Sequence, residues 1–578
     1  MTQRRRKTCF RPRLDRLEAR ECPAVDVVQR GAFLYLTGDA ADDWVAVCDE
    51  GGQVVEVQTA GGTEMFRGVK RVIANLGEDG DTFEFHQAAT GPNGNLNVAV
   101  DLGAGDDEFL YRTPPATGDV PPPNNDRPAA YSFNVRAGIG NDVMNMGPGV
   151  VPGLDLTFRF DLGEGNDSLD ASFQRHPAAA GTIQPCVSLA VAAGVGDDRV
   201  SLVIGSQDTA EPLFLEDVTV SIGGGEGNDT AVIAIVNTAV TGSLIQEMNT
   251  GDGDDIVSLS WKGCEILGPA VTRVALAEDH DVADITFSDN KYFAAVTTSV
   301  DAGGGDDIVA VLQSNPNEFL GPVNLRMALG DGDDEGSFFC DGNTSVAGSL
   351  TLVMNTGAGD DRAEALFTNP SNDKKDGPLG VRVNAGAGDD QVNVVIRDAN
   401  SVDGPLTVAV DGGTGDDGIV ADVDFTPRIR AGQLDPGNAP VSALINLRGG
   451  AGTDSINSYT EGVWSGVARF VVRGDDGDDA VGFHWGVGEG STGRLAVEIG
   501  GGAGDDVLTA DSVIPVEQVT PIYLRLLGGI GDDVLTANFL GGPDTTPASQ
   551  LYLLDGGLGF DFAHAPAGAL VRNCEGRI

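Results

Sequence analysis

The sequence has few of the residues that mark several common classes of protein. It carries 36 lysines and arginines against 87 aspartates and glutamates, which gives a formal net charge of −51. A nucleic-acid partner demands a basic footprint, so this balance excludes nucleic acid and points to cations instead. No stretch approaches the roughly eighteen apolar residues of a membrane-spanning helix. We therefore expect a chain with no membrane span that attracts positive ions.

The features of a disulfide framework, a zinc site and an active site are also missing. The seven cysteines are odd in number and scattered: Cys9, Cys22, Cys48, Cys186, Cys264, Cys340 and Cys574. They include no C-x-x-C pair and follow no period, which argues against both disulfides and zinc. The five histidines have no partner at metal-ligand spacing, and neither a nucleophile elbow nor a phosphate-binding loop is present. This pattern predicts that the protein is not an enzyme.

What the chain does contain is one motif repeated over most of its length. Gly-x-Gly-Asp-Asp, as in Gly103 to Asp107, recurs in steps that are mostly 25 to 31 residues long. Some copies have Asn in the first acidic place, as at Asn141-Asp142, and Ala277 to Asp281 is a decayed copy. Thr453 and Phe560 replace the first acidic residue in two others. Such a period indicates one supersecondary unit stacked on itself.

The residues that flank the motif alternate between apolar and polar, which is typical of strands with one buried face. Apolar residues stand six, four and two places before the first Gly, as in Leu406, Val408 and Val410, and a second alternating run follows the acidic pair. Each unit therefore reads as strand, tight turn, strand and variable loop, with room for a third short strand. We predict an all-β fold, a β-solenoid of about 17 stacked repeats. An antiparallel meander is the alternative.

Composition divides the chain into four segments. Residues 1–24 form a basic leader, residues 25–68 a β-rich N-terminal cap, residues 69–562 the repeats, and residues 563–578 a C-terminal cap or tail. The run from Arg13 to Ala24 resembles a short leader (R-L-E-x-L-E-x-R-x-x-P) of large repeat-bearing bacterial surface and exported proteins. Adjacent arginines at residues 4–6, near the start of the basic leader, also suggest a Tat signal, although a continuous apolar region is missing. A disordered basic tail is the other interpretation.

The motif also resembles the RTX (haemolysin-type) calcium-binding repeat. Residues 224–232, Gly-Gly-Glu-Gly-Asn-Asp-Thr-Ala-Val, match its nonapeptide G-G-x-G-x-D-x-U-x, as do those that start at Gly412, Gly449, Gly501, Gly528 and Gly556. In that family the Asp at the sixth position binds Ca²⁺ between stacked turns. The ligands that the resemblance implies are Asp107, Asp142, Asp167, Asp198, Asp229, Asp255, Asp307, Asp334, Asp361, Asp390, Asp417, Asp454, Asp479, Asp506, Asp533 and Asp561. RTX nonapeptides run in tandem, whereas here one occurs in each unit, so the solenoid would have at most one calcium edge.

Electrostatics favour a cation independently of the resemblance. Stacked coils would place one Asp above another at about 4.8 Å. Each like-charge pair would then cost roughly 0.9 kcal/mol in water and several times more near a protein surface. Calcium, with its oxygen ligands and loose geometry, would remove that cost. The competing interpretation is ordinary turn chemistry, which explains one Asp per turn better than two.

Together these features predict a calcium-binding repeat protein with a structural or adhesive role at the bacterial cell surface or in the extracellular matrix. Its partners would be Ca²⁺ and either a surface polysaccharide or other surface proteins. The first alternative is a carbohydrate-active enzyme, a polysaccharide lyase or an epimerase-like protein on a parallel β-helix. Basic residues gathered in one groove would favour that enzyme. Arg382, Arg448, Arg473 and Arg525 are candidates for this, although ion pairing with the Asp ladder would also explain them. An intracellular acidic scaffold is the second alternative.

Overall fold

A computed structural model provides the structure of the protein. It describes residues 25–577 apart from 88–94, 114–128, 148, 151–153, 176–183, 206–211, 315–316, 341–343, 369–376, 398–403, 426–428, 431–432, 435–441, 463–465, 489–490, 492, 514–520, 541–549 and 567. The basic leader predicted for residues 1–24 lies outside this part of the chain. The described residues form strands and turns and no helix.

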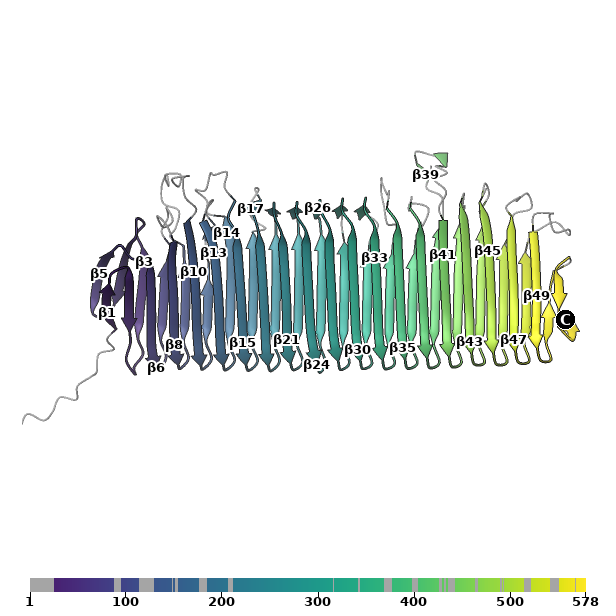
Figure 1. Cartoon of the computed structure of the whole chain (residues 1–578), viewed down its shortest axis with the longest axis horizontal. Coiled ribbons are helices and arrows are strands. Elements are labelled where there is room, and N and C mark those ends of the chain that lie inside the picture. Colours follow the sequence, from purple (N-terminus) through teal and green to yellow (C-terminus); the bar gives the residue numbers. More distant parts are fainter. Residues whose placement is uncertain are drawn as a thin grey trace, which may run out of the picture.

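The chain winds into a long β-solenoid in which strands of successive coils lie side by side (Figure 1). Each coil contributes one strand to a 21-stranded sheet, here sheet A, makes a tight turn, and returns along a second sheet, sheet B. In a typical coil, β33 (Leu350–Ala358) pairs in parallel with the sheet A strands before and after it, and β34 (Arg362–Phe367) does the same in sheet B. The parallel solenoid is thus confirmed against the meander, and the predicted number of about 17 repeats is close.

The strands of sheet A are β1 (Asp26–Arg30), β2 (Phe33–Thr37), β6 (Arg71–Glu78), β8 (Asn95–Ala104), β10 (Ala129–Ile139), β13 (Leu154–Glu164), β15 (Val187–Val195), β18 (Val218–Glu226), β21 (Leu244–Asp252), β24 (Ala270–Glu278), β27 (Val296–Gly304), β30 (Val323–Asp331), β33, β35 (Leu379–Ala387), β37 (Leu406–Thr414), β41 (Ser442–Ala451), β43 (Val467–Asp476), β45 (Arg494–Ala503), β47 (Ile522–Ile530), β49 (Gln550–Leu558) and β51 (Leu570–Arg572).

The strands of sheet B are β3 (Trp44–Asp49), β4 (Val54–Thr59), β5 (Gly62–Arg67), β7 (Thr82–His86), β9 (Glu108–Arg112), β11 (Val143–Met146), β12 (Gly149–Val150), β14 (Ser168–Arg175), β16 (Arg199–Gly205), β19 (Thr230–Val236), β22 (Ile256–Lys262), β25 (Val282–Ser288), β28 (Ile308–Ser314), β31 (Glu335–Cys340), β34, β36 (Gln391–Ile396), β38 (Gly418–Phe425), β42 (Ser455–Gly462), β44 (Ala480–Val487), β46 (Val507–Val513), β48 (Val534–Leu540), β50 (Phe562–His564) and β52 (Gly576–Arg577).

The central coils have a third, short strand in the connector, as the length of the repeat allowed. These strands form a six-stranded sheet: β17 (Leu213–Leu215), β20 (Thr238–Val240), β23 (Glu265–Ile266), β26 (Lys291–Tyr292), β29 (Glu318–Phe319) and β32 (Ser345–Val346). A separate two-stranded ribbon, β39 (Ile429–Arg430) with β40 (Gln433–Leu434), arises from a longer connector. The length of the connector therefore varies from coil to coil, while sheets A and B continue unchanged.

The two ends of the stack differ from the repeats. At the N-terminal end, β1 runs antiparallel to β2, and β4 runs antiparallel to both β3 and β5. Parallel stacking begins in the same segment, because β2 pairs with β6 and β3 with β7. At the other end, the short strands β51 and β52 add a last partial coil to β49 and β50.

The core lies between sheets A and B and is filled by the alternate side chains of every strand. In β33 the burial alternates strictly, and Leu350, Leu352 and Met354 are at most 5% exposed. The parallel register places these apolar residues above their counterparts in the next coil, so the core is continuous along the rod. Side chains of the opposite parity face solvent on the two sheet faces. The period of two in the sequence thus fixes which residues stand outside.

Candidate metal-binding edge

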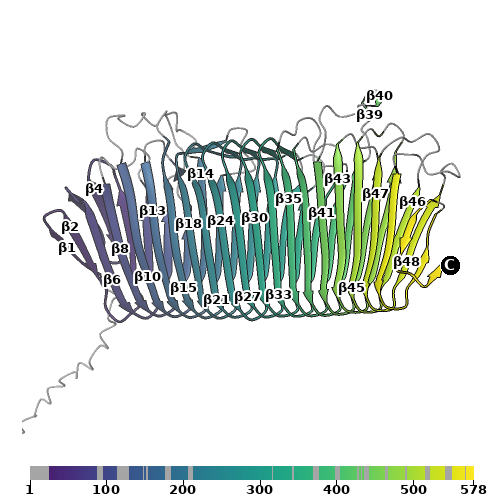
Figure 2. The same cartoon turned by 45° about the vertical axis from the view of Figure 1, so that its right-hand side comes forward.

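The tight turns between sheets A and B lie along one long edge of the solenoid (Figure 2). The glycines at the second and fourth positions of the nonapeptide have positive φ, for example 120° at Gly330 and 144° at Gly332. A Cβ added at Gly330 would lie 1.6 Å from the carbonyl oxygen of Gly303 in the preceding coil. The motif therefore retains Gly there because the backbones of stacked turns are too close for any side chain.

The Asp at the sixth position of each turn forms a continuous buried row, here called the inner row. It comprises Asp43, Asp81, Asp107, Asp142, Asp167, Asp198, Asp229, Asp255, Asp281, Asp307, Asp334, Asp361, Asp390, Asp417, Asp454, Asp479, Asp506, Asp533 and Asp561. None is more than 5% exposed. The amide of each donates to the carboxylate Oδ1 of the next coil, at 2.9 Å from Asp334 to Asp361 and 3.0 Å from Asp390 to Asp417. Glu575 replaces Asp at the end and accepts from Asp561 at 2.9 Å.

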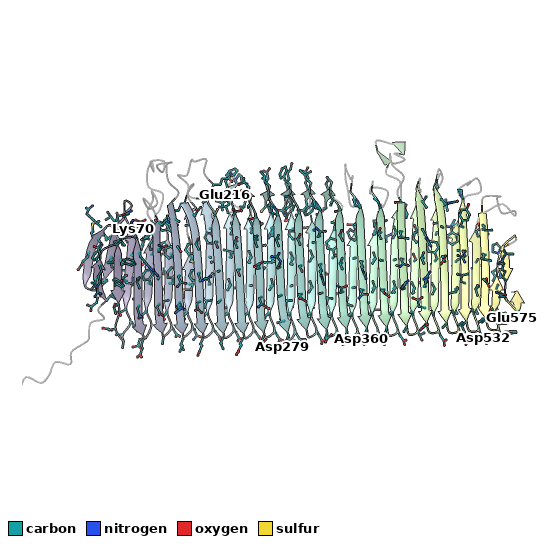
Figure 3. The ribbon with its side chains drawn as sticks, viewed as in Figure 1. Lys70, Glu216, Asp279, Asp360, Asp532 and Glu575 are labelled. Carbon is teal, nitrogen blue, oxygen red and sulfur yellow. The ribbon has the colours of Figure 1, made fainter. Side chains whose placement is uncertain are left out.

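The residue at the fifth position forms a second, exposed row, here called the outer row, which includes Asp360 and Asp532 at the lower edge of Figure 3. Its hydrogen bonds run in the opposite direction along the rod. The amide of Asp360 donates back to Asp333 Oδ1 at 2.8 Å, and that of Asp389 donates to Asp360 Oδ1 at 2.8 Å. Both acidic residues of the motif thus accept amides of neighbouring turns, so turn chemistry accounts for the pair better than the sequence suggested.

The second carboxylate oxygen of the inner row has no such explanation. Oδ2 of the inner-row aspartates from Asp81 to Asp561 is buried, as is Oδ1 of Asp43. These oxygens accept no hydrogen bond, except that the hydroxyls of Thr250 and Thr356 interact with the carboxyls of Asp255 and Asp361. Burying an ionised carboxylate oxygen that loses its water and gains no new partner costs free energy. Binding a proton or a cation removes that cost. The inner row thus contains a line of buried acceptor atoms that lack a hydrogen-bond donor or a cation.

A second oxygen lies near this unpartnered atom in some of the coils whose nonapeptide begins with Gly, namely those of Gly224, Gly412, Gly528 and Gly556. A Cβ added at Gly412 would lie 2.3 Å from Asp417 Oδ2 and 2.4 Å from the carbonyl oxygen of Gly449 in the next coil. At Gly528 the corresponding distances, to Asp533 Oδ2 and the Gly556 carbonyl, are both 2.2 Å. An ionised carboxylate oxygen and a main-chain carbonyl oxygen therefore converge on one small space. Both atoms are hydrogen-bond acceptors, so neither can satisfy the other. Oxygen pairs of this kind are typical of the ligand sets of hard cations.

Burial also raises the pKa of the inner-row carboxyls from Asp43 to Asp533. It raises the pKa of Asp334 and Asp506 to about 7, and that of Asp390 and Asp533 to about 6. The amide that each carboxylate accepts acts against this rise, while neighbouring carboxylates of the two rows add to it. In the absence of a cation, these raised pKa values favour the protonated, neutral form of the carboxyls at a higher pH than is usual for Asp.

Side chains alone do not assemble a complete site in the described residues. No three His, Cys, Asp or Glu side chains of that part gather around one point. The inner row supplies one carboxylate per coil, so any bound cation would take its remaining ligands from main-chain carbonyls and water. That division of ligands suits Ca²⁺, which accepts six to eight oxygens in variable geometry.

The structure places every predicted ligand in the inner row, and it adds four residues that the sequence analysis missed. Asp43 and Asp81 precede the first copy that the period identified, and Glu575 follows the last. Asp281 belongs to the decayed copy, where His280 occupies the outer row and accepts the Asp306 amide through Nδ1 at 3.0 Å. The sequence Gly77-Glu78-Asp79-Gly80-Asp81 could have revealed the turn before Gly103, because its last residue is an Asp at the same position as in the repeats. Thr453 and Phe560 interrupt the outer row but not the inner one.

The arginines expected to pair with the Asp ladder lie elsewhere. Arg473 and Arg525 point outward from sheet A, and both bind Glu498, with Nη to Oε distances of 3.3 and 3.2 Å. The expectation that these two pair with the ladder was wrong, because they stand before the turn on the flat face of the sheet. Among the described residues, Cys48, Cys186, Cys264, Cys340 and Cys574 form no disulfide.

Comparisons with known proteins give no family for the chain. No family model matches it, and no curated protein matches it either. In the described part of the chain, no helix is long and apolar enough to cross a bilayer.

Proposed function

We propose that the protein is a calcium-binding solenoid whose inner row of aspartates holds Ca²⁺ between stacked turns, at the coils where Gly begins the nonapeptide and no side chain covers the second carboxylate oxygen. The observation that carries this proposal is the buried, unpartnered second oxygen of the inner-row carboxylates other than Asp255 and Asp361. A divalent cation between coils would satisfy that oxygen and offset the repulsion along the row. The RTX-like motif supports the same assignment, with the difference that this rod has one ligand edge.

The two rows differ in which residues they tolerate, and the difference supports a role for charge. The outer row holds Asn at 141, 166 and 228, and His280, Thr453 and Phe560 at other coils. The inner row holds Asp at every coil from Asp43 to Asp561. Asn would accept the neighbouring amide through Oδ1 as well as Asp does, so amide capping alone would admit both. A carboxylate at every inner position suggests that the second oxygen and its charge are needed.

Calcium fits these ligands better than other common cations do. Carboxylate and carbonyl oxygens exclude soft metals, which prefer thiolate or imidazole. Magnesium demands octahedral geometry that a line of separate carboxylates does not impose. Sites with one carboxylate per coil would be weak, in the range of extracellular modules, about 10⁻⁴–10⁻³ M. This supports a location where calcium is abundant, and we place the protein outside the cell or on the bacterial surface.

The role that follows is structural or adhesive, and we propose that the protein is not an enzyme. Calcium would stiffen the turn edge, while the connectors on the opposite edge vary in length and could carry recognition. The second candidate, a polysaccharide lyase or an epimerase-like enzyme, has one observation in its favour: the group of arginines around Glu498. An assay for unsaturated sugars released from uronate polymers tests that candidate directly.

The central experiment removes calcium from the full chain. Far-UV circular dichroism and thermal melting would be recorded with calcium, with a chelator, and after calcium is added back. We expect the melting midpoint to rise with calcium concentration, since a ligand that binds the folded state stabilises it. Magnesium at equal concentration is the control and should have a smaller effect. An unchanged midpoint with and without the chelator would refute calcium binding.

A further inference from the structure

Five arginines gather on the outer face of sheet A in the C-terminal third of the rod. They lie on β41, β43, β45 and β47 and are here called the arginine face: Arg448, Arg469, Arg473, Arg494 and Arg525. Arg448 and Arg473 are direct neighbours in the parallel register. Elsewhere on the same face arginines are spread over many coils, as with Arg159, Arg273, Arg326 and Arg382. A basic cluster of this density is unusual in a chain with a net charge of −51.

The arginine face carries more positive charge than its own acidic residue can neutralise. Before the turn, the outward positions of these four strands hold a single acidic residue, Glu498, which Arg473 and Arg525 share. Arg448 and Arg469 are exposed and have no ion-pair partner among the described residues. Asp411 on β37 is the direct neighbour of Arg448 in the parallel register but forms no ion pair with it, and Asp555 on β49 bounds the other side of the cluster. The guanidinium donors of Arg448 and Arg469 are therefore available to an external anion.

Apolar and aromatic side chains surround these arginines. The guanidinium of Arg494 lies 4.7 Å from the ring centroid of Tyr523 and donates to its hydroxyl at 3.1 Å. Leu444 and Leu551 stand in the same row of the sheet as Tyr523 and are 43% and 56% exposed. Arginine offers a planar fork that binds carboxylates in a bidentate manner, and apolar surface beside it suits the C–H faces of sugar rings. The surface combines the two kinds of contact that an acidic sugar makes.

From this placement we infer that the arginine face binds an acidic polysaccharide whose carboxylates pair with the arginines while its sugar rings lie on the neighbouring apolar side chains. The inference rests on the proposed role at the cell surface and specifies the chemical class of the partner. It does not depend on calcium binding. A second copy of the chain fits less well, because its outer-row carboxylates already accept backbone amides of adjacent turns. Two chains that each carry −51 would also repel each other.

The test compares two pairs of substitutions that change charge equally on the same sheet face. Arg448→Gln with Arg469→Gln alters the arginine face, and Arg159→Gln with Arg326→Gln is the matched control outside it. Binding of the full chain to immobilised polygalacturonate would be measured at one fixed calcium concentration, with neutral dextran as the second surface. We expect the first pair to weaken binding by about tenfold or more and the control pair to bind like the wild type. Melting curves of both pairs check that the fold is retained.

Three outcomes would overturn the inference. They are no binding by the wild type, equal losses in the two pairs, and equal binding to dextran. A dimer in sedimentation that only the first pair dissolves would instead identify a second copy as the occupant. Calcium-dependent melting reports on the proposed metal site separately, so a failure of one proposal leaves the other measurable.

Discussion

The amide of Asp506 donates to Oδ1 of Asp533 in the next coil at 3.0 Å, while Oδ2 of both side chains is buried without a partner. One oxygen of each carboxylate thus joins adjacent turns, and the other is left without a hydrogen bond. The exposed neighbours Asp505 and Asp532 are joined in the reverse direction, from Asp532 to Asp505 Oδ1 at 2.8 Å. The same turn therefore contains two aspartates that differ in burial, and this difference can be tested.

Replacing Asp506 and Asp533 with Asn should separate the structural from the ionic role of the inner row. Asn keeps the Oδ1 acceptor but removes the charge, so we expect the calcium-free protein to fold with equal or higher stability. Calcium stoichiometry should fall by about two ions per chain, because each site would lose its carboxylate. Equilibrium dialysis with metal analysis measures the stoichiometry, and melting in chelator measures the stability.

The matched control replaces Asp505 and Asp532 with Asn, which changes the net charge by the same amount in the outer row. Asn already occupies this row at 141, 166 and 228. We therefore expect nearly the full complement of calcium and an unchanged melting midpoint. If the two double variants lose calcium equally, diffuse negative charge and not the buried row attracts the ion.

The raised pKa values of the inner row predict how stability depends on pH when calcium is absent. A carboxyl with a pKa of about 7 in the folded state, as at Asp334 and Asp506, and near 4 when unfolded binds its proton more tightly in the folded state. Its stabilising contribution is complete below the unfolded pKa and is lost as the pH rises through about 7. The melting midpoint in chelator should therefore be higher at pH 5 than at pH 8.

Two comparisons isolate the inner row in that experiment. High salt screens repulsion between exposed charges but acts weakly on buried ones, so the pH effect should persist in it. Calcium should raise the midpoint more at pH 8 than at pH 5, because protons compete with it for the same oxygens. A pH dependence that disappears in high salt would attribute the effect to surface charge.

Much of the fold could be predicted from sequence because the repeat combines two local signals. Alternating residues such as Leu406, Val408 and Val410 specify strands, and the glycines of the turn specify where each strand ends. Identical turns then stack in register, which predicts the row of aspartates. The direction of the hydrogen bonds between turns could not be predicted, since it depends on how far each carboxylate reaches along the rod. Ala277 to Asp281 was recognised as a decayed copy of the motif, but Asp281 was not predicted as a ligand because Ala277 and Asp279 replace the glycines of the turn.

Gly330 shows how strictly the turn requires glycine. Its φ is 120°, and an added Cβ would lie 1.6 Å from the carbonyl oxygen of Gly303, so Gly330→Ala must push two coils apart. We expect a loss of at least about 3 kcal/mol in local stability. Hydrogen exchange of the peptides that cover β30 and β31 measures it coil by coil. Gly380→Ala in β35 is the control, because nothing lies within 4 Å of its added Cβ, and it should be neutral or slightly stabilising.

Ala277 is the reverse case, a non-glycine residue with φ of 134° in the decayed turn. Such a conformation strains a residue that has a Cβ, so Ala277→Gly should stabilise this coil by about 1 kcal/mol. Ala275→Gly, two residues earlier in β24, lacks that conformation and should destabilise by roughly 0.5–1 kcal/mol. Opposite signs in urea unfolding or in local hydrogen exchange would confirm the strain. A loss in both variants would contradict it.

Gly224 and Gly223 are adjacent residues that should differ sharply in their effect on calcium. A Cβ at Gly224 would lie 2.2 Å from Asp229 Oδ2 and 2.1 Å from the Thr250 carbonyl oxygen, whereas a Cβ at Gly223 meets nothing nearer than 3.8 Å. The first position is Ala in other coils, as at Ala302 and Ala385, so the coil should still fold with Gly224→Ala. The methyl group would nevertheless displace the Asp229 carboxylate from the carbonyl that faces it.

We therefore expect Gly224→Ala to lose about one calcium ion per chain while the net charge stays the same. Gly223→Ala should retain the wild-type stoichiometry. Calcium-dependent protection from hydrogen exchange should disappear locally in β18 and β19 for the first variant and persist for the second. If Gly224→Ala keeps both its calcium and its protection, the carbonyl facing Oδ2 is not a ligand. The cation would then have to lie on the solvent side of the turn, nearer to the outer row than to the inner one.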